Sequence, residues 1–531
     1  MSTYRAGRRA GRPRRRSRWF LAGGLLAGSL VVGVAGAGGA LAAGRDLPFL
    51  TSGSAANLLG GEDAGREDGA KADPGMREPA GDGAGRPDGP NGDGRDGGAR
   101  EPERRDTAGE QPRTPGTGRH PVVSVPCDAA KLVAALVQAN AEGGASLRLA
   151  SNCTYTLTQA FHQVDEYDGG IRDAREAADA AETPGDAEAP PHKPEDDKAG
   201  LPVIYQPITI DGAGAVIERD VHAEDFRFFT VRDGGELTLR NVELRNGRSK
   251  IEGGSVHVVH GATAVVERVT VTGSTSLSPE GGGGGIFNDG NMVVTDSTFV
   301  GNSAAGAAGK GGGLLNGGVL TLRGSQFHHN SANAYGGGLG NYRGAADVDT
   351  TTFAQNSAAQ GGGMASFSAR TKVLDTTVVG NTAQIGGGIA NSDAVIVLRG
   401  MTIRDNTSTL KGGGISTVKG LLPVDDSVIE GNTTHGVGGG IYAEKSNVLV
   451  RGSDVAGNEA VGSGSTGGGI HATAGQVSLY TSRVVRNGAS VQPGGIFAQH
   501  ARVRIDDESV IVENEPTNCA GNAAPVATCF R

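Results

Sequence analysis

One phrase recurs nine times along this chain and limits what it can fold into. An aliphatic or aromatic residue stands three places before an asparagine, a few small residues follow, and then come a glycine run and another apolar residue, as in Phe327–Leu339. The asparagines lie 25 to 29 residues apart; they are Asn302, Asn330, Asn356, Asn381, Asn406, Asn432, Asn458, Asn487 and Asn514. A sequence period of 20–50 residues predicts a stacked or radial repeat architecture.

The positions before each asparagine predict which architecture forms. The residue three places before each asparagine is Phe, Val or Ile. The residue eight places before each of the first eight asparagines is Val or Leu. Both positions are therefore expected to form core columns. The second column consists of Val294, Leu322, Val348, Val373, Leu398, Val424, Val450 and Leu479. About 25 residues suit three short strands coiled into one turn, whereas a propeller blade needs about 40. We predict an all-β, single-stranded right-handed parallel β-helix (a solenoid).

Two corners of each turn are expected from the residue types. The glycine runs, such as Gly311–Gly313, supply backbone freedom at a tight corner that a Cβ would obstruct. We expect the asparagines at a second corner in the left-handed region, which Asn tolerates well. Stacked about 4.8 Å apart, their amides would form a hydrogen-bonded ladder as in cross-β stacks. A row of sugar-binding asparagines is the functional alternative to this structural ladder.

Composition and charge exclude some functions. Glycine accounts for 91 of 531 residues and aromatic residues for only 4%, which is unusual for a globular enzyme. The glycines do not follow the strict triplet repeat of collagen. The formal net charge is −9. A nucleic-acid-binding protein needs a basic stripe, so we expect no nucleic-acid partner.

The N-terminal residues 1–43 predict export. Eight arginines between Arg5 and Arg18 precede an uncharged run from Phe20 to Ala43, and Ala40-Leu41-Ala42 offers a small-residue cleavage site. The run of 24 residues is also long enough to span a bilayer. Both a cleaved signal peptide, which we favour, and an uncleaved membrane anchor satisfy the pattern.

Two further segments look unstructured. Residues 44–120 are rich in Gly, Asp, Arg and Pro and cannot bury enough apolar surface to offset chain entropy, so we predict a disordered linker. Residues 163–200 are acidic and rich in Ala and Pro. We predict a mobile insertion there within a β-helix domain of residues 121–531; cation binding by its acidic cluster is the alternative to a solvated charge run.

Caps are expected at both ends of the repeat. Asp128 is a candidate N-cap of a short helix with Leu132 and Leu136 on its apolar face, ending before Gly143. Such a cap helix would cover the open first rung. Four cysteines allow three pairings; we expect the two local ones, Cys127–Cys153 and Cys519–Cys529, because each pair brackets one end. A four-thiolate metal site would require the two ends to meet, and we expect no metal or cofactor.

The repeat also resembles known proteins. Its Phe-x-x-Asn phrase followed by Gly-Gly-Ile/Leu resembles the repeats of the polymorphic outer-membrane protein family and, more broadly, the pectin-lyase-like β-helix superfamily. The stretch from Cys127 to Cys529 resembles a group of exported bacterial right-handed β-helix proteins, with Cys153–Thr158 and Pro516–Cys519 as marks. The superfamily includes polysaccharide lyases and glycoside hydrolases, so the resemblance implies this fold and raises the question of catalysis.

Few residues support catalysis. A glycosidase needs two carboxylates facing one sugar ring. Asp425-Asp426 is the best adjacent pair within the repeats, yet neighbours on a strand point to opposite faces. Asp506-Asp507 lies at the C-terminal cap, and His328-His329 is more typical of polar surface than of a metal site. His260-Gly261 and Arg248–Ile251 only faintly match polygalacturonase motifs. We therefore name no catalytic residue and leave enzyme activity as the alternative.

The sequence thus favours an exported scaffold, either attached to the cell envelope or secreted, that binds or displays without catalysis. Its partner would be a cell-surface polysaccharide or the surface of a host or neighbouring cell, and the membrane itself if the N-terminal segment is uncleaved. The segments between asparagine and glycines vary most in length and predict the binding edge, or the sheet beside it. Those segments are 303–310, 331–335, 433–437 and 459–466.

Overall fold

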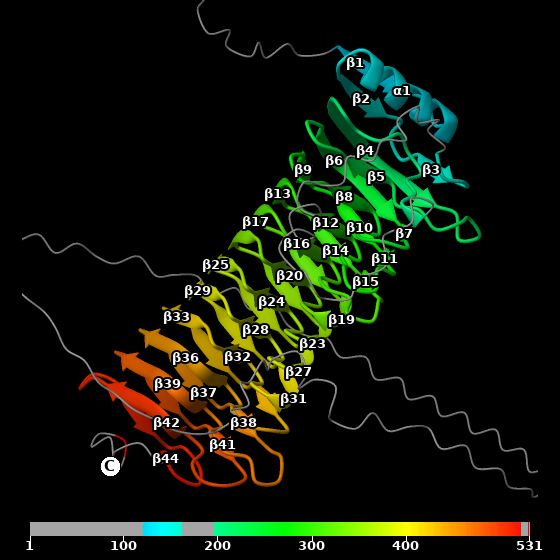
Figure 1. The fold of residues 1–531 in the computed structure, drawn as a ribbon. Helices are drawn as coiled ribbons and strands as arrows, with labels where there is room; N and C mark the ends of the chain where they lie inside the picture. Colours follow the sequence, from blue (N-terminus) through cyan, green and yellow to red (C-terminus); the bar gives the residue numbers. More distant parts are fainter. Residues whose placement is uncertain (1–120, 162–195, 522–528, 530–531) are drawn as a thin grey trace, which may run out of the picture. The chain divides into compact units, whose positions relative to one another are not determined.

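The computed structural model describes residues 121–161, 196–521 and Cys529. All of them fall in the second of two units into which the chain divides, Gly109–Arg531. Within it, short parallel strands stack in chain order into a right-handed parallel β-helix with one helix, α1 (Ala129–Ala141), at the end where the strands begin (Figure 1). The predicted fold class and cap helix are confirmed.

The turns have four strand columns rather than the predicted three strands, and in three turns the first two columns merge into one long strand. Three columns of strands belong to one large sheet, and the fourth column, which directly follows the asparagines, forms a separate ten-stranded sheet. The fourth strand escapes prediction because it is as short as two residues and shows no apolar alternation. Its members are β7 (Arg248–Ser249), β11 (Thr275–Ser276), β15 (Ser303–Ala304), β19 (Ser331–Tyr335), β23 (Ser357–Gln360), β27 (Thr382–Ile385), β31 (Thr407–Lys411), β35 (Thr433–Thr434), β38 (Glu459–Ala460) and β41 (Gly488–Ala489).

The first column follows the glycine corner, and the second column follows the first within each turn. First strands are β5 (Phe229–Val231), β8 (Val256–Val258), β12 (Ile286–Asn288), β16 (Leu314–Asn316), β20 (Leu339–Tyr342), β24 (Met364–Phe367), β28 (Ile389–Ser392) and β32 (Ile415–Val418). Second strands are β9 (Thr263–Glu267), β13 (Asn291–Thr295), β17 (Val319–Arg323), β21 (Ala345–Asp349), β25 (Arg370–Leu374), β29 (Val395–Arg399) and β33 (Leu421–Asp425). Three long strands run through both columns: β36 (Ile441–Arg451), β39 (Ile470–Tyr480) and β42 (Ile496–Ile505).

The third column ends at the asparagine corner. It comprises β10 (Thr270–Thr272), β14 (Thr298–Val300), β18 (Gln326–His328), β22 (Thr352–Ala354), β26 (Thr377–Val379), β30 (Thr402–Arg404), β34 (Val428–Glu430), β37 (Asp454–Ala456), β40 (Arg483–Val485) and β43 (Val510–Val512). Near the first rungs β4 (Pro207–Arg219) and β6 (Glu236–Arg245) run through the second and third columns. The remaining strands are β1 (Val122–Val125), β2 (Ala145–Leu149), β3 (Thr154–Leu157) and β44 (Cys519–Gly521).

The core is built from columns of like residues in strict register. In β17 the buried Leu320 and Leu322 alternate with outward residues, and Leu322 pairs in register with Val348 of the next rung. Every member of the predicted Val294 column is at most 1% exposed. The phenylalanines of the other column stack directly, with ring centroids 4.4 Å apart for Phe299 and Phe327. Alternation with a period of two places one face of each strand inside, so sequence pattern alone specifies the register.

The glycine corners leave no space for side chains. Gly386 adopts φ +64°, a left-handed conformation that suits glycine. A Cβ on the following Gly387 would lie 2.4 Å from the carbonyl oxygen of Gly413, and one on Gly388 would press on Asn406. Successive rungs therefore approach each other closely at this corner because the backbone carries no Cβ.

The cap helix begins where the sequence predicts. The Asp128 side chain accepts hydrogen bonds from the backbone N–H groups of Ala130 at 2.8 Å and Lys131 at 3.2 Å, which caps α1. Leu132 and Leu136 are fully buried and belong to the same core cluster as the first rungs. The helix thus closes the apolar end of the coil.

Several predictions concern residues outside the described ranges. The signal or anchor segment 1–43, the linker 44–120 and the insertion 163–200 up to residue 195 all lie there. Among the residues that the structure describes, no helix combines the length and apolar character needed to cross a bilayer.

Candidate functional site

The nine repeat asparagines form a continuous interior column. Each side-chain Nδ2 from Asn302 to Asn487 donates to Oδ1 of the next asparagine at 2.9–3.0 Å and to a backbone carbonyl of the preceding rung at 2.9–3.0 Å. Ser274 extends the column at its start, since its backbone N–H donates to Asn302 Oδ1 at 2.9 Å. All nine are at most 6% exposed. These amides are therefore turned away from any ligand on the surface.

The expected backbone conformation of the asparagines is wrong. The left-handed residue at this corner is the one directly before each asparagine: Gly301, His329, Gln355, Gly380, Asp405, Gly431, Gly457, Arg486 and Glu513. The corner therefore turns one residue earlier than predicted. The asparagine itself is selected because its amide can serve two rungs at once, which is a hydrogen-bonding requirement and not a backbone one.

A second interior polar column escaped the sequence analysis. It follows the glycine corner, where Asn288 Nδ2 donates to Asn316 Oδ1 at 2.7 Å and Asn316 Nδ2 donates to Asn341 Oδ1 at 2.9 Å. Further along, Asn391 Nδ2 donates to Thr417 Oγ1 at 3.1 Å. The signal was present as an asparagine two places after the apolar residue that follows the glycines, but it alternates with Ser and Thr and so lacks a constant residue type.

The carboxylates considered for catalysis are engaged in ion pairs or turns. Asp425 accepts two hydrogen bonds from Arg451 at 2.6 and 2.7 Å, while Asp426 faces Arg399 at 3.3 Å. The two aspartates thus point to different partners and do not face one substrate. Asp506 accepts from the backbone N–H and hydroxyl of Ser509, chiefly through the latter, which lowers the pKa of the carboxyl.

The histidine pair lies on the surface. His328 and His329 place their Nδ1 atoms 3.3 Å apart on the surface, and burial followed by the charge of His329 lowers the pKa of His328. Within the described ranges no group of three or more His, Cys, Asp or Glu side chains could hold a metal ion.

Disulfides join the predicted cysteines at both ends. Cys127 pairs with Cys153 beside α1, and Cys519 pairs with Cys529 beyond the last rung, each with Cα atoms 5.7 Å apart. The first bond links the start of the cap helix to the residue before β3. The first bond therefore ties the cap helix to the coil.

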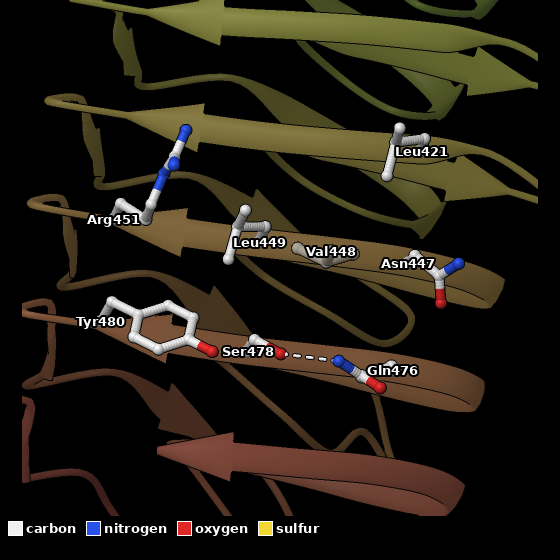
Figure 2. Close-up of a pocket in the computed structure, with 8 residues that line it drawn as sticks. All are labelled: Leu421, Asn447, Val448, Leu449, Arg451, Gln476, Ser478 and Tyr480. Atoms are coloured by element: carbon white, nitrogen blue, oxygen red, sulfur yellow. Dashed lines mark hydrogen bonds between the residues drawn. The ribbon is translucent and has the colours of Figure 1, made fainter. Parts of the chain in front are cut away.

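Three hollows lie on or beside the outer face of the second strands. The first, of about 460 Å³, crosses β33, β36 and β39, with Arg451 and Tyr480 at one end and Asn447 and Gln476 at the other (Figure 2). The others, of about 690 and 280 Å³, adjoin each other over β17, β21, β25 and β29. All are shallow, and the four loops predicted as the binding edge line none of these three.

Clusters of aromatic and ionisable side chains lie on a different side of the coil. We define the first-strand face as the outward side chains of the first strands together with the residue before each glycine triplet. In β20, Leu339 and Asn341 point inward, so Gly340 and Tyr342 point outward. Register places one residue per rung on this side in a row: His257, Phe287, Leu315, Gly340, Ala365, Ala390, Ser416, Tyr442, His471 and Phe497. Only His257, Phe287 and Phe497 of this row are partly exposed, and the others are buried.

One cluster on this face combines stacked rings with hydrogen-bonding groups. Lys411 Nζ donates to the Tyr442 hydroxyl at 2.9 Å and to Glu444 at 3.3 Å, and the Tyr442 hydroxyl donates to Glu444 at 2.7 Å. The rings of Tyr442, His471 and Phe497 then stack along the axis, with centroids 5.6 and 4.6 Å apart. We call these five residues the C-terminal cluster.

Three side chains of the C-terminal cluster have shifted pKa values. Burial, and then the hydrogen bond to Glu444, raises the pKa of the Tyr442 hydroxyl. Burial opposes ionisation of Glu444, but the hydrogen bond from Tyr442 and the charge of Lys411 outweigh it and lower the pKa of that carboxyl. Burial lowers the pKa of His471 to about 4, so its ring is neutral at pH 7. Such shifts gather at functional sites, although ion-pair networks also produce them.

A second aromatic cluster lies nearer the N-terminus of the same face. Tyr342 and Phe367 stack with centroids 5.3 Å apart and an interplanar angle of 18°, and Tyr335 lies 5.4 Å from Phe367. All three rings are half-buried, so part of each faces solvent. In the two rungs between the clusters the row holds the small residues Ala390 and Ser416.

The variable loops contribute to this face after all. Lys310, Tyr335, Val437 and Thr466 are the last residues of the four loops predicted as the binding edge, and each directly precedes a glycine triplet. Thr466 Oγ1 lies 3.0 Å from His471 Nδ1. The sequence could not reveal the clusters, because Lys411 and Tyr442 are far apart in the chain and meet only when the rungs stack.

A buried ion pair marks the N-terminal rungs. The fully buried Arg227 donates to Asp197 at 2.5 Å and to Thr230 Oγ1 at 3.0 Å. Burial of Asp197 favours the neutral acid, but the nearby charges, Arg227 foremost, outweigh it and hold its pKa at about 2. This pairing holds Asp197 against Arg227 of the first rungs.

Comparisons with known proteins find only distant structural likenesses. No family model matches the sequence, and no curated protein matches it. Among solved structures, the chain is similar to the periplasmic alginate epimerase AlgG, at 11% identity over 57% of this chain and 78% of that one, with a TM-score of 0.34. It is similar to the A-module of the Azotobacter vinelandii mannuronan C-5 epimerase AlgE4, at 13% identity over 75% and 96%, with a TM-score of 0.40.

Tailspike protein 3 of bacteriophage CBA120 is also similar, at 14% identity over 74% of this chain and 61% of that one, with a TM-score of 0.34. At such identities and TM-scores the likeness carries no argument about activity.

Proposed function

We propose that this chain is an exported, non-catalytic scaffold that binds a linear polysaccharide along the first-strand face. The observation that carries the proposal is the aromatic cluster of Tyr335, Tyr342 and Phe367, whose half-buried rings come from neighbouring rungs of this face. Aromatic rings offer an apolar face with polar edges, against which the C–H face of a sugar can pack.

The geometry suits an extended polymer. Solenoids create long binding surfaces because each rung presents the same positions to a ligand that lies along the axis. Neighbouring rungs are about 4.8 Å apart, so successive contacts repeat at short intervals. Side chains that can form hydrogen bonds with a sugar lie next to the rings. They include Lys411 and Glu444 of the C-terminal cluster and the neighbouring Thr473. The two disulfides support export, because disulfides persist in oxidising compartments.

A polysaccharide lyase or glycoside hydrolase is the second candidate. The shifted pKa values of Tyr442, Glu444 and His471 favour it. Against hydrolysis, the C-terminal cluster contains a single carboxylate, whereas the usual mechanisms need two about 5–9.5 Å apart. Non-catalytic binding is therefore the function that the geometry supports best.

The test is a binding screen of soluble neutral and acidic polysaccharides with wild-type protein and two matched variants. Phe367→Ala removes a ring from the first-strand face, and Tyr480→Ala removes an exposed ring beside the first hollow on the second-strand face. We expect Phe367→Ala to weaken binding about tenfold, since buried aromatic contacts of this kind are worth of order 1 kcal/mol or more, and Tyr480→Ala to leave it unchanged.

Two results would contradict the proposal. Binding that depends on Tyr480 and not on Phe367 would move the site to the second-strand face. Release of new reducing ends or of unsaturated sugars on prolonged incubation, lost in Tyr442→Phe, would instead establish the enzyme. Circular dichroism of each variant verifies that the fold is retained.

A further inference from the structure

Two positive charges converge on one aromatic ring of the first-strand face. Lys310 Nζ lies 5.1 Å and Arg343 Cζ 5.3 Å from the centroid of the Tyr342 ring. Phe367 stacks on that ring from the next rung. Both cations therefore border the half-buried aromatic cluster to which we assign sugar packing.

Neither cation is neutralised by an ion pair with a described residue. Lys310 Nζ donates to the backbone carbonyl of Glu280, and the carboxylates of Glu252 and Glu280 influence it without forming an ion pair within 4.0 Å. Burial is the main cause that lowers the pKa of Lys310, and the charge of Arg343 adds to it. Elsewhere on the coil, exposed arginines such as Arg451 and Arg240 do pair with carboxylates of an adjacent rung.

A third unpaired cation lies beside them. Arg343 and Arg370 both line the hollow of about 690 Å³, and neither makes a side-chain hydrogen bond or ion pair with the described residues. Asp289 and Asp393 line the same hollow. The hollow adjoins the first-strand face through Arg343, which touches both the Tyr342 ring and this space.

Resting on the proposed function, we propose that the polysaccharide is acidic and that Lys310, Arg343 and Arg370 bind an anionic substituent of a sugar residue packed against Tyr342 and Phe367. A guanidinium presents planar paired donors that match a carboxylate or sulfate. The ring carries the apolar face of the sugar while the cations hold its charged group. The like-charged neighbours, which repel each other in the free protein, would both gain from a shared anion.

The experiment compares matched polymers that differ in charge alone. Polygalacturonate is compared with its carboxyl-reduced form, and dextran sulfate with dextran, on full-length protein at low and moderate salt. The first pair tests a carboxylate source and the second a sulfate source. Variants are Arg343→Gln and Lys310→Gln, with Arg323→Gln as the control, since Arg323 is an exposed arginine of the second strand β17.

We expect at least one charged polymer to bind about tenfold more tightly than its neutral counterpart at low salt, with the difference shrinking as salt rises. Arg343→Gln and Lys310→Gln should each remove most of that difference, because charge-assisted hydrogen bonds are lost, while Arg323→Gln keeps it. Arg343→Lys, which retains charge without the planar fork, should fall between wild type and Arg343→Gln.

Equal binding of charged and neutral polymers overturns the acidic specificity but leaves the proposed function intact if Phe367→Ala still weakens both. An effect of Arg323→Gln as large as that of Arg343→Gln shows general attraction and also overturns the site. Failure of every polymer to bind overturns the site and the proposed function together. Thermal melts of each variant exclude unfolding as the cause.

Discussion

At the scale of the residue, one asparagine amide bonds to two rungs, the one before it and the one after it. Asn381 Nδ2 donates forward to Asn406 and backward to the Phe353 carbonyl, while its Oδ1 accepts from Asn356. The group is fully buried, and a buried amide left without partners is costly. The residue type is thereby fixed by hydrogen bonding at both sides of the rung.

We predict that Asn381→Ala lowers the free energy of unfolding by about 1–3 kcal/mol, because its neighbours in the column lose buried partners. Thr382→Ala, at the exposed next position, is the control and should change stability by less than about 0.5 kcal/mol. Denaturant unfolding followed by circular dichroism measures both. Equal stability of wild type and Asn381→Ala would show that the column is not structural.

At the scale of the element, the glycine corner differs from the asparagine corner in what it demands of the backbone. Gly380, directly before Asn381, has φ +63°, and a Cβ added there would have the flexible Gln355 side chain as its nearest neighbour, at 3.7 Å. A Cβ on Gly387 would instead meet the backbone carbonyls of Gly413 and Thr407 at 2.4 and 2.5 Å. Conformation limits the first position, and rung spacing limits the second.

We predict that a glycine-to-alanine substitution destabilises the protein by different amounts at the two corners. Gly380→Ala should cost about 1–2 kcal/mol, the penalty for a left-handed residue with a Cβ. Gly387→Ala should cost more, at least about 3 kcal/mol or failure to fold, because backbone of the next rung cannot move aside as a side chain can. Melting curves of both variants provide the comparison, and a Gly387→Ala protein as stable as Gly380→Ala would contradict this account of the corner.

Some elements of the fold were predictable from the sequence and others were not. The core columns, the glycine corners and the Asp128 cap were predictable, because each depends on a residue type that recurs or on local chemistry. The fourth strand was not, since Ser303-Ala304 is too short for a periodic signal. The contacts of Lys411 with Tyr442, or of Lys310 with Tyr342, were also hidden, because they follow from register across loops of unequal length.

At the scale of the whole molecule, the rungs contact chiefly their neighbours, so the coil should behave as a one-dimensional array. The interval from Ser357 to Thr382 is 25 residues, and the strands β23 to β26 pair with β27 to β30 at this same offset. Removing one such interval therefore restores every pairing one rung further along.

We predict that deletion of residues 357–381 gives a folded protein with an unchanged β-type circular dichroism spectrum and a melting temperature within a few degrees of wild type. Deletion of residues 357–369, about half a turn, should abolish cooperative melting because it places outward residues in the core. A full-turn deletion that unfolds, or a half-turn deletion that melts cooperatively, would contradict the array description.

The asparagine column also gives the coil an electrical direction. From Asn302 onward every amide carbonyl points to the preceding rung and an N–H points to the following one. Parallel strands contribute only small net dipoles, so nine aligned side-chain amides add a permanent dipole along the axis with its positive end at Asn514. There Asn518, from the same chain, offers its Oδ1 to Asn514 Nδ2 at 3.0 Å, much as an acceptor caps a helix N-terminus. The positive end of this nine-rung dipole is therefore capped by an acceptor from the same polypeptide.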